Sequence, residues 1–165
     1  MKKRWLLSPT ILLAALCSCI YTLSGSSLPS HLKTVEVPLF ANQSLEPNIA
    51  EEITRQLSTD IVAGNLLKVV ETNGNAVLNG TVTSYKNEPY TYGASETRRV
   101  DVQQYVVRIT ADVEFLDAKN NEPIYKGQVT GEGIYDLSNQ TEENGKQAAI
   151  KEMVQRILAN SVQGW

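Results

Sequence analysis

Residues 102–116 alternate between apolar and polar side chains, and this alternation constrains the fold more than any other feature of the chain. Successive side chains of a β-strand point to opposite faces, so one face of this strand is expected to be buried and the other wet. The apolar positions are Tyr105, Val107, Ile109, Ala111, Val113 and Phe115. The polar positions include Arg108, Thr110, Asp112 and Glu114. The pattern predicts an antiparallel sheet with one face against a core.

Four further strands are expected around this one. Pro38 indicates an edge strand or a strand end, and an Asn73-Gly74 turn separates the second strand from the third. The expected strands are 33–40 with Val35, Val37 and Leu39 on one side, 66–71, 77–86 with Leu78, Gly80 and Val82 toward one face, and 124–135 with Tyr125 and Val129 toward the core.

Two segments have the apolar period of an amphipathic helix. The first is expected to begin near Pro47 and to end at Gly64, with a stripe made of Ile49, Ile53, Leu57 and Ile61. The second runs from about Thr141 to Val162, with a stripe made of Ile150, Val154, Ile157, Leu158 and Val162. The order of elements predicts an α+β two-layer sandwich, with an antiparallel or mixed sheet of about four to five strands and both helices on one face.

The N-terminus has the pattern of a lipoprotein signal peptide. Three basic residues precede an apolar run, residues 5–16, that is too short to span a bilayer. Leu16 and the small Ser18 occupy positions −3 and −1 relative to Cys19, which suits a lipoprotein signal peptidase. The alternative is a secreted chain with an unmodified cysteine. We expect a signal peptide at 1–18, a lipidated tether at 19–31 that carries palmitate on Cys19, and a single α+β domain at 32–165.

Charge and cysteine content narrow the class of protein further. Removal of residues 1–18 leaves 147 residues, enough for one domain, with Cys19 as their only cysteine. The remaining 12 Lys and Arg against 18 Asp and Glu give a formal charge of −6, which disfavours a nucleic-acid partner. Asp after the lipidated cysteine retains lipoproteins at the inner membrane in enteric bacteria, so Ile20 favours the outer membrane.

The chain offers little material for catalysis. His31, the one histidine, lies in the expected tether, so neither a Ser-His-Asp triad nor a His-Cys metal site is expected. Gly131-Glu132-Gly133 lies within a strand and lacks the following helix of a phosphate loop. Asp112 and Glu114, about 7 Å apart by strand geometry, are within the reach of a glycosidase pair, although such carboxylates on a wet face are usually solvated. We expect no enzyme activity, metal or cofactor.

Residues 87–100 form a polar loop that is a candidate binding site. Arg98 and Arg99 together with Tyr90 and Tyr92 suit an anionic, partly apolar ligand, because arginine binds phosphate through two donors and tyrosine is amphipathic. The other interpretation is a surface loop whose charges keep it soluble. The wet face of the sheet has two interpretations as well: ordinary solvated surface, or a surface inside a partner with a wet interior.

The whole pattern resembles the lipopolysaccharide-assembly lipoproteins of the outer membrane, the LptE family. The resemblance covers nearly all of the mature chain and depends on the order and spacing of its parts. These are the lipobox with a Ser-rich tether, Lys33-Thr34-Val35-Glu36-Val37, the helix ending near Gly64, Leu78-Asn79-Gly80-Thr81-Val82, the strand Tyr105 to Phe115 with its hairpin, and Ile150-Lys151-Glu152-Met153 in the closing helix.

The resemblance implies a protein that sits largely inside a wide β-barrel, the lipopolysaccharide-assembly barrel. There it is expected to plug the barrel, to help it fold and to take part in lipopolysaccharide transport to the outer leaflet. The acidic charge of the mature chain favours the plug over direct lipopolysaccharide binding by Arg98 and Arg99. A scaffold lipoprotein of another envelope complex, such as a transporter accessory or a barrel-assembly subunit, is the alternative.

Overall fold

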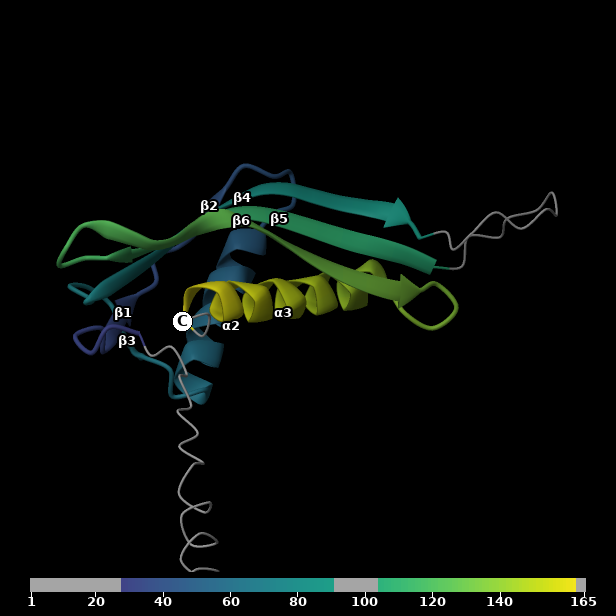
Figure 1. The fold of residues 1–165 in the computed structure, drawn as a ribbon. Helices are drawn as coiled ribbons and strands as arrows, with labels where there is room; N and C mark the ends of the chain where they lie inside the picture. The colour runs from purple at the N-terminus through teal and green to yellow at the C-terminus, as the bar shows by residue number, and fades with distance from the viewer. Residues whose placement is uncertain (1–27, 91–103, 163–165) are drawn as a thin grey trace, which may run out of the picture.

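Six strands and two helices make up the part of the chain that the structure, a computed structural model, describes: residues 28–90 and 104–162. The sheet has the order β3-β1-β4-β5-β6, with β2 alongside β4, and both helices lie on one of its faces (Figure 1). This confirms the α+β sandwich, although the sheet has six strands where about four to five were expected. The elements are β1 (Thr34–Glu36), β2 (Ala41–Asn42), α2 (Ile49–Ala63), β3 (Lys68–Val70), β4 (Ala76–Pro89), β5 (Gln104–Asp117), β6 (Glu122–Asp136) and α3 (Glu142–Ser161).

The three long strands pair antiparallel, whereas β1 runs parallel to both β3 and β4. The predicted faces of β5 are confirmed, since Val107, Ile109, Ala111 and Phe115 are fully buried against the helices. One polar-face position departs from the pattern: Val106 is also buried. Its neighbour on β6 is Ile134, so this end of the polar face is apolar.

A bulge in β4 limits how far its alternation can be extrapolated. The pairing with β5 shifts register between Val82 and Ser84. Before the shift Leu78 and Val82 are buried, as predicted. Beyond it the odd positions face the helices, so that Tyr85 packs against the core.

Of the segment expected as one strand over residues 33–40, only Thr34–Glu36 (β1) is a strand. The chain leaves the sheet around Pro38, and the next strand, β2, begins at Ala41. Placing Leu39 on the same side as Val35 was wrong, because Leu39 is 63% exposed and Phe40 is buried in its stead. The ring of Phe40 lies directly over Gly80, where any Cβ would overlap it. A glycine is therefore required at this point of β4.

The apolar stripe of α2 is fully buried, as the sequence predicts. The helix begins at Ile49, so Pro47 is not its first residue; Asn48, with φ 61°, precedes the first turn. Gly64 is the C-cap, and Asn65 takes the left-handed conformation, φ 49°. The Leu66 amide donates to the Ile61 carbonyl and the Asn65 amide to that of Val62, which is the Schellman arrangement.

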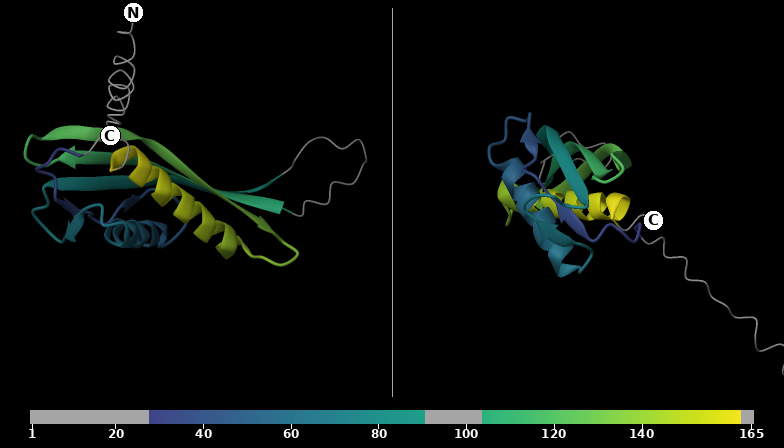
Figure 2. Two further views of the ribbon diagram at one scale, coloured as in Figure 1. Left: turned by 60° about the horizontal axis from the view of Figure 1, so that its bottom comes forward. Right: turned by 90° about the vertical axis from the view of Figure 1, so that its left-hand side faces the viewer.

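Helix α3 lies along β5 and β6 (Figure 2), with its predicted stripe buried. Gly131 and Gly133 of β6 let the helix approach closely. A Cβ on Gly131 would stand 2.6 Å from the Met153 Cβ, and one on Gly133 would stand 2.6 Å from the Ala149 nitrogen. The Gly-x-Gly pair thus serves helix–strand packing.

Candidate functional site

The candidate site is the face of β4, β5 and β6 that points away from the helices, called here the outer face. Its side chains are connected across the strands. The Lys126 ammonium lies 3.0 Å from a Glu114 carboxylate oxygen, and the Gln128 amide donates to Asp112 at 3.3 Å. Such cross-strand pairs stabilise a sheet and neutralise its charges locally.

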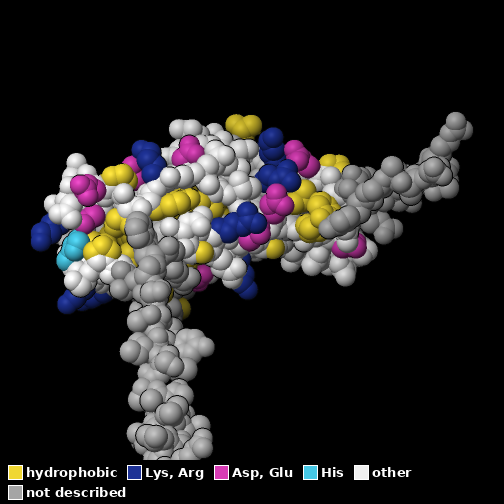
Figure 3. Space-filling view, viewed as in Figure 1, with side chains coloured by type: hydrophobic (Ala, Val, Ile, Leu, Met, Phe, Trp, Pro, Cys, Tyr) yellow, Lys and Arg dark blue, Asp and Glu magenta, His cyan; other side chains and the backbone are white. Residues whose placement is uncertain are grey.

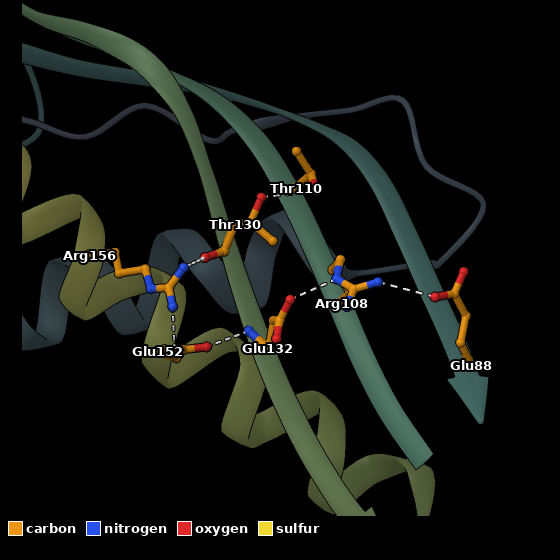
Figure 4. A network of polar contacts seen from close by, with 7 residues as sticks. All are labelled: Glu88, Arg108, Thr110, Thr130, Glu132, Glu152 and Arg156. Carbon is orange, nitrogen blue, oxygen red and sulfur yellow. Dashed lines mark hydrogen bonds and ion pairs between the residues drawn. The ribbon is translucent and has the colours of Figure 1, made fainter. Parts of the chain in front are cut away.

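Arg108 is the centre of the outer face. Its guanidinium lies 2.8 Å from Glu132 on β6 and 3.1 Å from Glu88 on β4, so that one cation bridges all three strands (Figure 4). The hydrogen bond to Glu132 is the main cause that raises the pKa of Arg108. All three side chains are between a third and a half exposed, so each pair contributes little stability. Their consequence is a fixed pattern of charge on a wet surface.

The polar contacts continue around the outer edge of β6 to α3. The Glu132 amide donates to Glu152 at 2.5 Å, and Arg156, paired with Glu152, donates to the Thr130 carbonyl oxygen at 2.9 Å (Figure 4). Farther along, the Asp136 amide donates to the Gln140 side chain. Basic and acidic side chains alternate along this side of the molecule (Figure 3). Side chains from α3 and its leading loop thus form hydrogen bonds with backbone amides and a carbonyl of the edge strand β6.

The Asp112 and Glu114 carboxylates line an open hollow of about 390 Å³ on the outer face. The Asp112 carboxylate is bonded to Gln128 and the Glu114 carboxylate is paired with Lys126. This is the arrangement of a solvated surface. Within residues 28–90 and 104–162, no three His, Cys, Asp or Glu side chains are grouped to hold a metal. The described helices include none long and apolar enough to cross a membrane.

His31 is held against the domain by a hydrogen bond of 2.7 Å from its Nε2 to Asp117, at the end of β5. Burial alone would raise the pKa of Asp117, but hydrogen bonds from His31 and from the Lys119 and Asn120 amides outweigh it and lower the pKa. The contact joins the segment before β1 to the β5–β6 turn. Nothing in the sequence pattern links these two places.

A second charged cluster, also missed by sequence reasoning, joins the N-terminal ends of the two helices. Lys146 of α3 is only 12% exposed and lies within ion-pair distance of Glu143 (2.8 Å), Glu46 (3.3 Å) and Glu52 (3.6 Å). The hydrogen bond to Glu143 is the largest of the interactions that raise the pKa of Lys146. Nearby, burial and a hydrogen bond to Glu142 raise the pKa of Tyr85. The cluster fixes how α2 and α3 cross.

The three site residues predicted from the sequence, Cys19, Arg98 and Arg99, lie outside the described residues. The two ends of the segment that carries Arg98 and Arg99 are described. Strand β4 continues to Pro89, and the Tyr90 amide donates to the Gln104 carbonyl oxygen at 2.8 Å, so the hairpin extends farther than the expected loop start at residue 87.

Solved structures with low sequence identity share this fold. The hypothetical protein CT253 from Chlamydia trachomatis is 10% identical with a TM-score of 0.55, over 78% of this chain and 97% of that one. The PelC dodecamer from Paraburkholderia phytofirmans is 20% identical with a TM-score of 0.51, over 83% and 93% of the two chains. No curated protein matches the chain. The class is that of small α+β domains with helices on one face of a sheet.

The chain matches the model of the LptE family, described as lipopolysaccharide-assembly, over residues 32–161, and it belongs to that family. Membership confirms the resemblance noted in the sequence. It makes the protein a lipopolysaccharide-assembly lipoprotein of the bacterial envelope.

Proposed function

We propose that this protein is an outer-membrane lipoprotein, acylated at Cys19, whose domain plugs the lipopolysaccharide-assembly β-barrel. It helps the barrel to fold and takes part in moving lipopolysaccharide to the outer leaflet. It acts by binding and positioning, without catalysis, metal or cofactor. The observation that carries this proposal is the outer face, where polar side chains from three strands are paired with one another.

The outer face suits the inside of a wide barrel for a physical reason. The lumen of such a barrel is polar and filled with water. A surface whose charges are already paired can enter it without leaving an uncompensated charge. Arg108, fixed between two carboxylates, also offers a defined electrostatic pattern for recognition.

A photoreactive amino acid at Gln128, which is exposed at the middle of the outer face, tests the plug in intact cells. We expect a covalent adduct with the lipopolysaccharide-assembly barrel, identified by mass spectrometry. The same variant kept in the dark is the matched control and should give no adduct. Failure to capture any barrel from Gln128 would contradict the plug.

A scaffold in another envelope complex is the second candidate, because PelC, which has the same fold, forms a dodecamer. The identity and stoichiometry of the captured partner separate the two. An adduct with a second copy of this chain, or with a transporter subunit, favours the scaffold.

Replacing Cys19 with alanine should abolish the membrane anchor, because the acylated sulfur would be lost. We expect an uncleaved or misplaced precursor that takes up no labelled palmitate. The measurement is fractionation after carbonate washing together with palmitate labelling. Cys17→Ala, two residues earlier, is the matched control and should be processed normally. A Cys19→Ala protein that still carries palmitate would place the anchor elsewhere.

Replacing both Arg98 and Arg99 with glutamate should weaken binding to purified lipopolysaccharide by about tenfold or more. A hydrogen bond to a charged group contributes roughly 1.5–3 kcal/mol, and solvent exposure moves the value to the low end. Tenfold corresponds to about 1.4 kcal/mol. The double variant Lys119→Glu/Lys151→Glu makes the same change in net charge at exposed positions elsewhere and should bind as before. Unchanged affinity in the arginine variant, with the fold intact, would leave the plug without direct ligand contact.

A further inference from the structure

The parallel pairing of β1 and β3 sorts charge along these two short strands. Lys33 directly precedes β1, Lys68 begins β3, and the Lys68 amide donates to the Lys33 carbonyl oxygen at 3.0 Å. Glu36 ends β1, and Glu71 directly follows β3. Parallel strands that pair in register start at the same edge, so the backbones of the two lysines lie at one end of the strands and those of the two glutamates at the other.

The two lysines line a hollow of about 520 Å³ together with the C-terminal end of α2. Val62 and Leu66 also line it, and Val62 is 58% exposed. Both lysines are exposed, and within residues 28–90 and 104–162 neither is within ion-pair distance of a carboxylate. The two cations flank these apolar side chains and form a surface, called here the basic end, that suits anions attached to apolar bodies.

The N-terminal segment joins the domain at the basic end. Leu28 packs against the core, Leu32 is buried, and Lys33 follows directly. Cys19 lies nine residues before Leu28, so even a fully extended chain places the two Cα atoms no more than about 31 Å apart. Acyl chains on Cys19 would therefore keep Leu28, where the domain begins, within about 31 Å of the membrane anchor.

We propose that the basic end is a membrane-contact surface for anionic phospholipids. Lys33 and Lys68 bind lipid phosphate groups, and Val62 enters the headgroup region, where basic and apolar side chains act together. The basic end then lies at the bilayer surface beside the opening of the barrel, while the end of β4 and the start of β5, at the far end of the sheet (Figure 1), point into the lumen. This inference rests on the proposed anchor at Cys19.

The test uses the acylated full-length protein in vesicles of phosphatidylcholine with or without phosphatidylglycerol. A fluorophore is attached to a single introduced thiol, Val62→Cys, and its quenching by brominated lipids is measured. Leu137→Cys, another exposed apolar position that follows β6, is the matched control. We expect strong quenching at position 62 only, and only with phosphatidylglycerol.

Neutralising both lysines, Lys33→Gln/Lys68→Gln, should lower the ratio of docked to undocked domains by about thirtyfold, since each lysine near an anionic surface contributes about 1 kcal/mol. The urea midpoint of this variant shows whether it folds. If it does not fold, the test is made on the protein that keeps both lysines, where added salt should reduce the quenching at position 62. Equal quenching at positions 62 and 137, with the protein still floating with the vesicles, overturns the contact surface and leaves the anchor intact. Protein that does not float contradicts the anchor, and the inference falls with it.

Discussion

Replacing Gly133 with alanine should lower the free energy of unfolding by about 3 kcal/mol, the upper end for an over-packed core. The new Cβ would overlap the Gly145 carbonyl oxygen and lie 2.6 Å from the Ala149 nitrogen. These atoms belong to the backbone of α3, so no single side chain can move aside. The helix would have to shift away from β6 along its length.

Urea unfolding followed by circular dichroism measures this effect. Gly64→Ala is the matched control, because Gly64 has an ordinary φ of −80° and its nearest side-chain neighbour, the Leu66 Cγ, would stand 3.1 Å from the new Cβ. That change should alter stability by less than about 1 kcal/mol. Equal midpoints for the two variants would show that α3 does not lie on β6 as described.

Truncating Ile109 to alanine should cost about 3 kcal/mol, through lost burial and the cavity left behind. Ile109 is fully buried at the centre of β5, opposite Tyr85 and Gly131, where the surrounding strands cannot collapse easily. Val113, two positions along the same face, should show a smaller loss on truncation because fewer atoms are removed.

Thr110→Ala is the control for Ile109, since the next residue of the strand faces outward and its hydroxyl makes only a 3.4 Å contact with Thr130. Its cost should stay below about 1 kcal/mol. If the two variants unfold at the same urea concentration, the faces of β5 have been assigned the wrong way round.

Sequence periodicity predicted the parts of the fold in which one residue pattern governs one element. The alternation in β5 and the four-residue stripe of α2 both gave the buried residues correctly. The pattern failed where local geometry interrupts it: at the bulge after Val82, and at Pro38, beyond which Phe40 takes the buried place given to Leu39. The position of a bulge could not be predicted from the alternation of apolar and polar side chains.

The candidate site was predicted less completely, because most of it depends on contacts between distant segments. The polar side of β5 indicated a wet face, but not that Arg108 would join Glu88 and Glu132. Lys146 and its carboxylates come from two distant stretches of chain, residues 46–52 and 143–146. The close approach of α3 to Gly131 and Gly133 could have been predicted from the sequence, because the facing helix also carries small residues there: Gly145, Ala148 and Ala149.

The side chains of α3 and its leading loop that bind the edge strand β6 bear on how the protein would behave once it is tethered. The proposed lipid anchor would confine many copies to a plane, where collisions between neighbours are frequent. At that density, an edge strand with unpaired amides and carbonyls can pair with the edge strand of a neighbouring molecule, which leads to aggregation. With the Thr130 carbonyl and the Glu132 and Asp136 amides already bonded to Arg156, Glu152 and Gln140, a neighbour finds fewer donors and acceptors to recruit. Helix α3 and its leading loop would thereby help to keep crowded, anchored copies from pairing with one another.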